Sequence, residues 1–526
     1  MDAATIHRRR WAILAILSLS VFLVVVDNTI VNVALPTLSR ELGATTSELQ
    51  WIVDAYSLVF AGLLLAAGSL GDRLGRKGAL QIGLVAFGLT SMLAAFSDSA
   101  TQLIAARAAM GIGAALVFPA TLAILTNVFT DPGERAKAIG MWAGVSGLAV
   151  ALGPVTGGWL LQHFWWGSVF FVNLPIVIGA LIAGQLLLPT SRDPAAGRFD
   201  PLGFLLSVVA VSTLVYTVIA APERGWASTE TAAGFVLAAV LTLAFVAWEL
   251  RCESPMLDVR VFTNARFSAA AAAVAVAFFA LFGFIFLVTQ YFQFVRGYDT
   301  LSAGLHTLPF AVAAGIAAPV APRLVTRAGT SRIVAVGLLL MAVGFVVAAT
   351  TDEHSSYWLH VVPAMVLIAS GLGLANAPST EAIMGALPRE KAGVGSAVND
   401  TTRELGGTLG VAVVGSVFAS VYGPNLVDAL RGMPIPEPAR HAARESMAAA
   451  FTVADQAPPE AQPIIIDAAK DAFVNGLAVG SLTAATAAAL GAIAVLKFLP
   501  ARAREAATAE VPAAAADVAS SWEPAS

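Results

Sequence analysis

Three ionisable residues lie in long apolar stretches near the start of the chain. Asp27 is in the run from Trp11 to Pro36, Asp54 is in QWIVDAYSL and Arg107 is in LIAARAAMGIGAAL. A charge inside a bilayer costs at least about 2.5 kcal/mol, so such residues usually face protein or water and mark paths for protons, ions or substrates. The residue types therefore favour a proton- or cation-handling site. The alternative is a buried structural ion pair.

A second group of charges occurs late in the chain, in VNDTTRELGG. Asp400 and Glu404 are four residues apart on one helix face, and Arg403 can neutralise only one of them. Burial disfavours the charged form of a carboxylate and a nearby arginine favours it, so a carboxylate in this setting can hold a proton or a cation in competition. Such competition is the simplest form of proton-for-cation exchange. Alternatively, Asp400 belongs to an interfacial first turn, where acidic residues suit a helix N-terminus.

Several kinds of chemistry have no residues to carry them. The sequence contains no GxxxxGK[ST] phosphate loop, no HExxH motif and no Cys/His cluster, and its single cysteine is Cys252. We therefore expect no enzymatic activity, no cofactor and no metal, and an energy source that is an ion gradient. A net charge of -4 gives no sign of a nucleic-acid partner.

The composition indicates which kind of structural element holds these charged residues in place. The chain has 526 residues, of which 58% are hydrophobic and 12% are charged. These values are typical of a polytopic membrane protein with α-helical spans. About 20 apolar residues cross a bilayer, and we count fourteen such runs. They begin near Trp11, Leu49, Gly78, Thr101, Ala136, Gly167, Pro201, Thr231, Phe267, Leu301, Ser331, Tyr357, Gly393 and Phe473.

The distribution of positive charge orients these runs. Most of the 30 Lys and Arg residues fall on the two ends of the chain and on the loops of the same side, which predicts that both termini are cytoplasmic. With a rise of about 1.5 Å per residue, Asp27 lies about 24 Å beyond Trp11. Asp54 and Arg107 lie about 8 and 9 Å from the outer ends of their spans. The three side chains are therefore expected at similar depth.

The order of the runs predicts the domain organisation. Residues 1–190 form a six-helix bundle, residues 191–260 two additional membrane helices, and residues 261–500 a second six-helix bundle. Residues 423–471 form an insertion on the outer side, either a helical hairpin or a flexible loop. Residues 501–526 form an Ala-rich tail that is expected to be disordered.

Two glycine-rich motifs appear mechanical. GSLGDRLGRKG joins spans two and three through a tight turn with a possible charge latch, or only anchors the chain by its positive charge. Small residues and a proline in span five suit a sliding or bending seam, or static close packing. The loop residues are Gly68, Gly71, Asp72, Arg73, Gly75, Arg76 and Lys77, and the span-five residues are Gly147, Gly153, Pro154, Gly157 and Gly158. Trp51, Tyr56 and Phe118 could line a cation site, although aromatic residues on spans more often pack or face lipid.

The chain resembles the major facilitator superfamily in four segments: GSLGDRLGRKG, RAAMGIGAAL, GPVTGG and VVVDNTIVNVALPTL. The layout of six, two and six spans is similar to its fourteen-helix drug:proton antiporter branch. The resemblance implies a major facilitator fold in the bacterial plasma membrane and export of lipophilic, often cationic, drugs or antiseptics driven by the proton motive force. We further expect the chain to act as a monomer. It also implies that Asp27, Asp54, Arg107, Asp400 and Glu404 handle protons or substrate. The alternatives are a dedicated exporter of an endogenous metabolite or antibiotic and a gradient-driven importer.

Overall fold

The computed structural model describes residues 3–190, 200–253, 255, 257–386, 392–431, 433 and 435–500, and these residues form helices and connecting loops without a strand. The all-α fold class predicted from the sequence is therefore confirmed. The tail 501–526 and residues 191–199 of the predicted linker lie outside the described residues.

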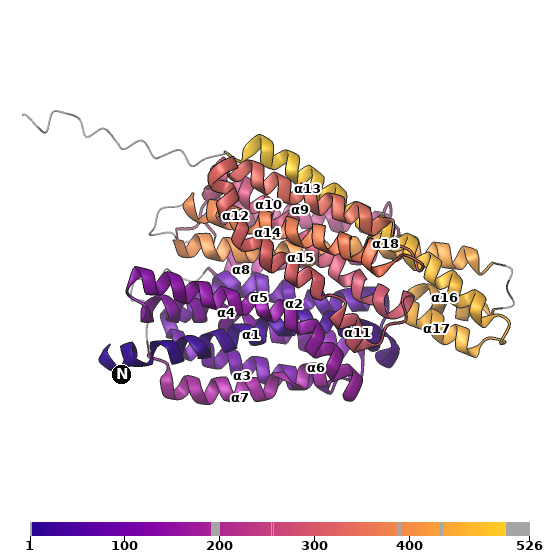
Figure 1. Ribbon diagram of the computed structural model, residues 1–526, viewed down its shortest axis with the longest axis horizontal. Coiled ribbons are helices and arrows are strands. Elements are labelled where there is room, and N and C mark those ends of the chain that lie inside the picture. Colours follow the sequence, from indigo (N-terminus) through magenta and orange to yellow (C-terminus); the bar gives the residue numbers. More distant parts are fainter. Residues whose placement is uncertain are drawn as a thin grey trace, which may run out of the picture.

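The N-terminal bundle occupies one half of the molecule, drawn in indigo to magenta in Figure 1. Its helices are α1 (Ala3–Leu42), α2 (Thr46–Leu74), α3 (Arg76–Ala95), α4 (Ala100–Val128), α5 (Pro132–His163), α6 (Ser168–Phe171) and α7 (Asn173–Leu187). Local sequence sets where they begin. Thr45 and Glu48 form a capping box at α2, and Asp131 caps α5 with a proline in its first turn.

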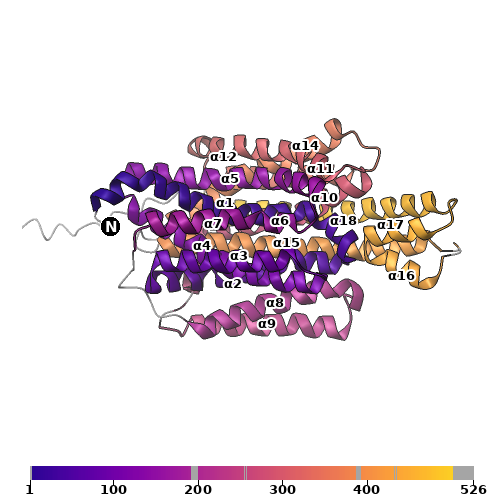
Figure 2. The same cartoon turned by 90° about the horizontal axis from the view of Figure 1, so that it is seen from below.

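Two further helices, α8 (Pro201–Arg224) and α9 (Thr229–Glu249), lie side by side along one edge of the molecule (Figure 2). The C-terminal bundle forms the other half. Its elements are η1 (Val259–Thr263), α10 (Ala265–Gln290), η2 (Tyr291–Val295), α11 (Thr300–Leu305), α12 (Leu308–Ala328), α13 (Thr330–Ala349), η3 (Tyr357–Val361), α14 (Val362–Gly385), α15 (Ala392–Ala429), α16 (Glu437–Glu445), α17 (Met447–Gln456) and α18 (Gln462–Phe498).

Twelve helices in the described part of the chain are long and apolar enough to cross a membrane. The helices α2 and α5, with 29 and 32 residues, are not among the twelve, although both coincide with predicted apolar runs. The chain is thus a multi-pass membrane protein, and the number of fourteen spans stays a prediction. The start of α1 and the end of α18 lie at the same end of the molecule, opposite α16 and α17 (Figure 1).

The insertion after α15 is helical. Its two short helices α16 and α17 lie between the long helices α15 and α18, so of the two alternatives for this segment the structure has the helical one. The Ser39 hydroxyl donates to that of Ser446 at 3.3 Å, and the Thr46 hydroxyl donates to the carbonyl of Glu445 at 2.8 Å. The insertion therefore contacts the N-terminal bundle as well as its own.

A proline creates another junction between the bundles. Pro36 has no N–H, so the Asn32 carbonyl loses its usual partner within α1. The Thr289 hydroxyl of α10 donates to that carbonyl at 2.8 Å, and Gln293 donates to the carbonyl of Val33 at 2.8 Å. In the described part of the chain, the hydrogen bonds between the two bundles gather at the end that carries α16 and α17. The molecule is closed at that end.

Candidate functional site

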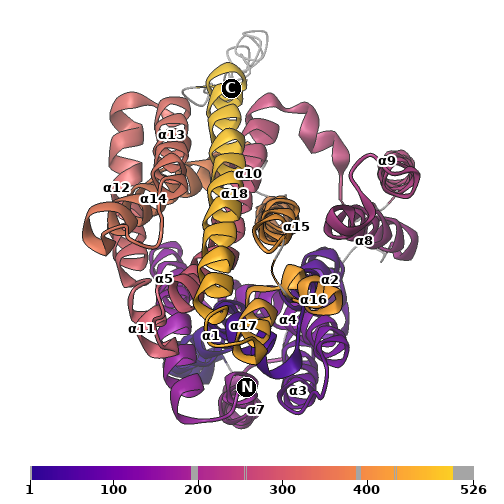
Figure 3. The same cartoon turned by 90° about the vertical axis from the view of Figure 1, so that its right-hand side faces the viewer.

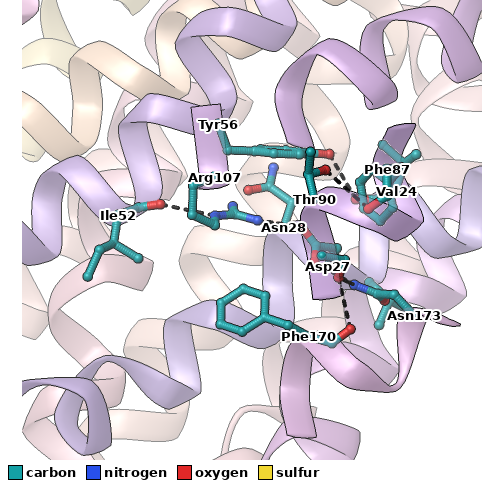
Figure 4. Close-up of polar contacts among 12 residues, drawn as sticks. Val24, Asp27, Asn28, Ile52, Tyr56, Phe87, Thr90, Arg107, Phe170 and Asn173 are labelled. Carbon is teal, nitrogen blue, oxygen red and sulfur yellow. Dashed lines mark hydrogen bonds and ion pairs between the residues drawn. The ribbon is translucent and has the colours of Figure 1, made fainter. Parts of the chain in front are cut away.

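The centre of the N-terminal bundle contains a buried ion pair. Nη1 of Arg107, on α4, lies 2.5 Å from Oδ2 of Asp27, on α1, and both side chains are fully buried (Figure 4). Two of the three residues that were expected at one depth therefore meet. The geometry fits the buried ion pair that the sequence allowed as an alternative. Proton handling by this pair stays a prediction.

Helix α2 supplies another side of this pair. Nε of Arg107 donates to the carbonyl of Ile52 at 3.1 Å, and the guanidinium carbon lies 4.2 Å from the centre of the Tyr56 ring. The Tyr56 hydroxyl in turn donates to the carbonyl of Val24 at 3.4 Å. A cation over an aromatic face gains more when both are shielded from water, as they are here. The arginine is thus fixed by three helices.

Asn173 completes the site and was missed from the sequence. Its Nδ2 lies 2.8 Å from Oδ1 of Asp27 and 3.0 Å from the Ser91 hydroxyl, and Ser91 donates to the carbonyl of Phe170 at 2.8 Å (Figure 4). The signal was an amide side chain inside the apolar run FFVNLPIVIG, which a search restricted to ionisable residues passes over.

Asp54 is placed differently from the pair. It is fully buried, and neither carboxylate oxygen has a hydrogen-bond partner in the described part of the chain. Gln50, one turn earlier on the same face of α2, donates to the carbonyls of Val411 and Ala412 on α15 at 3.1 and 3.0 Å. Asp54 therefore lies on the side of α2 that faces the C-terminal bundle.

The second predicted group lies on α15. Nη1 of Arg403 is 3.7 Å from Oδ1 of Asp400, and its Nη2 is 3.2 Å from Oδ1 of Asn376 on α14. Glu404 is partly exposed and has no ion pair in the described part of the chain. Val411 lies two turns later on the same face of α15, and its carbonyl accepts a hydrogen bond from Gln50 of α2. The arginine is thus occupied with one acid, and the other faces the N-terminal bundle. No group of three His, Cys, Asp or Glu side chains among the described residues could hold a metal ion.

The glycine-rich loop forms the turn between α2 and α3. Gly75 has φ of +112°, a conformation that residues with a Cβ rarely adopt. Nη1 of Arg76 donates to the carbonyl of Ala123 at 3.4 Å, and Lys77 donates to the carbonyl of Gln185 at 2.8 Å. A Cβ at Gly71 would lie 3.3 Å from that of Ala79. The side chains of Asp72 and Arg73 and the surroundings of Gly68 lie outside the described part, so the latch stays a prediction.

The span-five motif forms close contacts on two sides of α5. A Cβ at Gly153 would overlap the Thr29 hydroxyl of α1, and one at Gly157 would lie 2.6 Å from Cγ1 of Ile30. A Cβ at Gly158 would overlap the carbonyl of Thr300, which begins α11. The motif therefore joins α5 to its own bundle and to the other bundle.

The remaining members of the motif and the predicted aromatic residues are placed as follows. Gly304 approaches the carbonyl of Pro154, and the surroundings of Gly147 lie outside the described part. Phe118 packs against Trp142 with ring centres 5.4 Å apart, and Trp51 packs against Tyr216 of α8 at 6.3 Å. Of the three predicted aromatic residues, only Tyr56 lies beside the ion pair.

Comparisons with known proteins agree with this architecture. The family model described as Major Facilitator Superfamily matches residues 17–411. The multidrug efflux pump LfrA of Mycolicibacterium smegmatis is 39% identical over 91% of this chain and 94% of its own length. The methyl viologen resistance protein SmvA of Salmonella typhimurium is 38% identical over 89% and 93%.

A solved structure shares the fold. The crystal structure of a bacterial homolog of the human lysosomal transporter Spinster, in an inward-facing and unoccupied conformation, aligns with a TM-score of 0.65. Its identity of 17% over 94% of this chain and 98% of that chain supports the fold alone. By the family match and the identity to its relatives, the chain belongs to the Major Facilitator Superfamily.

Proposed function

We propose that this protein exports lipophilic, often cationic, drugs or antiseptics across the bacterial plasma membrane in exchange for protons. The observation that carries the proposal is the unpaired, partly exposed Glu404 on the face of α15 that contacts α2, the bundle of which also contains the buried Asp27–Arg107 pair. Relatives named as a multidrug efflux pump and a methyl viologen resistance protein support the choice of substrate class.

The two acids have different tasks in this proposal. Glu404 binds either the cationic group of a substrate or a proton, because Arg403 is paired with Asp400. Asp27 is held by Arg107 and responds to protonation by releasing it. The proton motive force supplies the energy, since one charge that crosses 100 mV gains about 2.3 kcal/mol.

Alternating access follows from the junction between the bundles. If the positive-inside rule holds, the chain ends lie in the cytoplasm and the closed end carrying α16 and α17 faces outward. The conformation described here is then the one that takes up substrate from the cytoplasmic side. Substrate and protons are exchanged when the hydrogen bonds of Gln50, Thr289 and Gln293 to the opposite bundle break. We propose that one chain performs this cycle as a monomer.

The test is efflux of ethidium from cells that express wild type, Asp27→Asn, Glu404→Gln or Asp98→Asn, with and without a protonophore. Asp98 is an exposed loop carboxylate and serves as the matched control. We expect loss of export in the first two variants and with the protonophore, and wild-type export in the control. Full export by Glu404→Gln, or wild-type export at the same rate with and without the protonophore, contradicts the proposal. If only one compound of a broad panel of test compounds is exported, the protein is instead a dedicated exporter.

A further inference from the structure

An apolar groove runs along the surface of the C-terminal bundle between α12 and α14. It has a volume of about 700 Å³, and apart from the Ser370 hydroxyl its lining side chains are apolar. From α12 it is lined by Val312 and Ile316, which are 60% and 63% exposed, and from α14 by Val366 and Leu374. A groove of this size could hold a hydrocarbon chain.

The packing of α14 shows which way the groove faces. Gly373 of α14 contacts Ala317 of α12, and Gly371 contacts Gly337 and Met341 of α13. The groove-lining residues of α14 lie between these two contact sides. Asn376, which bonds to Arg403 of α15, lies on the other side of the α12 contact. The groove therefore opens away from the carboxylates of α15, and α12 and α14 lie at the periphery of the molecule (Figure 3).

The helix face that forms the groove ends in two arginines. Spacings of four, four, three and four residues place five side chains on one stripe of α12, namely Val312, Ile316, Val320, Arg323 and Arg327. Both arginines are exposed, and neither has an ion pair in the described part of the chain. They lie toward the same end of the molecule as the two chain termini, because α12 runs away from the end that carries α11.

We infer that this groove is a binding site for an anionic phospholipid, with one acyl chain between α12 and α14 and the headgroup phosphate at Arg323 and Arg327. The groove from Leu324 to Leu308 is about 24 Å long, which is enough to span the ~15 Å hydrocarbon depth of one leaflet. Guanidinium groups bind phosphate through paired N–H donors. A cationic drug would find no counter-charge here, and a second copy of the chain would need an acidic face opposite the arginines.

The headgroup contact is tested with spin-labelled phosphatidylglycerol and phosphatidylcholine and the full chain in nanodiscs. The variants are Arg323→Gln/Arg327→Gln and, as a matched control, Arg8→Gln/Arg9→Gln, which removes two exposed arginines at the same end of the molecule. Each arginine near an anionic surface contributes about 1 kcal/mol, so we expect the first double variant to lose preference for phosphatidylglycerol by up to about 30-fold. The control keeps the preference. Equal preference in both double variants overturns the inference.

The acyl-chain contact has its own pair of variants. Ile316→Trp fills the groove, whereas Leu243→Trp adds the same ring to α9 at a side chain that is 68% exposed. We expect the first to lower the amount of immobilised lipid and the second to leave it unchanged. No difference between them overturns the inference. So does a change of oligomeric state in Ile316→Trp, which would assign the groove to a second copy, or displacement of the lipid by ethidium, which would assign it to a drug.

Discussion

The coupling between Asp27 and Arg107 can be measured by a double-mutant cycle with Asp27→Asn and Arg107→Gln. Both side chains are fully buried and are joined at 2.5 Å, so each single variant leaves one buried group without its partner. Breaking a buried pair from one side costs about 3–5 kcal/mol. The double variant leaves two amides that can hydrogen-bond to each other and to Asn173. We therefore expect it to lose about 2–3 kcal/mol instead of the sum of about 6–10.

The chain contains a matched control for this cycle. Arg10 and Glu134 form an ion pair of the same type at 2.9 Å, but their side chains are 18% and 36% exposed. Exposed pairs contribute about 0.2–1 kcal/mol, because water and salt screen them. The cycle Arg10→Gln with Glu134→Gln should therefore give a coupling energy several-fold smaller than that of the buried pair.

The assay is unfolding of the purified chain in mixed micelles, followed by tryptophan fluorescence, with ethidium efflux measured in parallel. The loss of unfolding free energy in the buried double variant should be smaller than the sum of the losses in its two single variants, while export stays lost. Equal coupling energies in the two cycles, or additive losses in the buried cycle, would refute the assignment of Asp27 and Arg107 as one buried unit.

Two further predictions concern the contacts of α5 and α11. Gly153→Val should lower the free energy of unfolding by about 1–3 kcal/mol, because its side chain would overlap Thr29, whereas Gly144→Val on the same helix, where nothing lies within 4 Å of the added Cβ, should not. A thermal shift compares them, and equal losses contradict the close contact. Asp299 caps α11, and its pKa lies below the ordinary 3.8, mainly through the backbone N–H of Ser302. A lowered pKa stabilises the fold above the unfolded value, and this stabilisation is lost as pH falls through the folded value. The protection of α11 against hydrogen exchange, corrected for the intrinsic exchange rate at each pH, should therefore fall below about pH 3.8 in the wild type and not in Asp299→Asn, and identical profiles would contradict the cap.

Much of the architecture could be predicted from apolar run length and local signals. Each predicted run coincides with a long helix or a pair of consecutive helices, because about 20 apolar residues have one stable arrangement in a bilayer. For residues 423–471 the sequence allows both a helical hairpin and a flexible loop, since Pro434 and Pro436 interrupt its helical periodicity. Contacts with α1 and α2, far away in the sequence, help to hold it as α16 and α17.

The site was predictable in depth but not in direction. Rise per residue placed Asp27, Asp54 and Arg107 at one level, and two of them meet. Asp54 faces α15 instead, because the rotation of a helix about its own axis depends on packing that depth alone does not fix. Asn173 was missed for a different reason. A neutral amide costs less in an apolar run than a charge and gives a weaker signal.

At the junction between the bundles, the uncharged side chains of Thr289, Gln293 and Gln50 donate hydrogen bonds to backbone carbonyls. One of these carbonyls, that of Asn32, is free to accept because Pro36 has no N–H. Hydrogen bonds between uncharged groups are weakened little by dissolved salt, because salt screens interactions between charges. When the bundles separate, water molecules can hydrogen-bond to the freed side chains and carbonyls. The ease with which this end of the molecule opens should accordingly change little between dilute and saline surroundings.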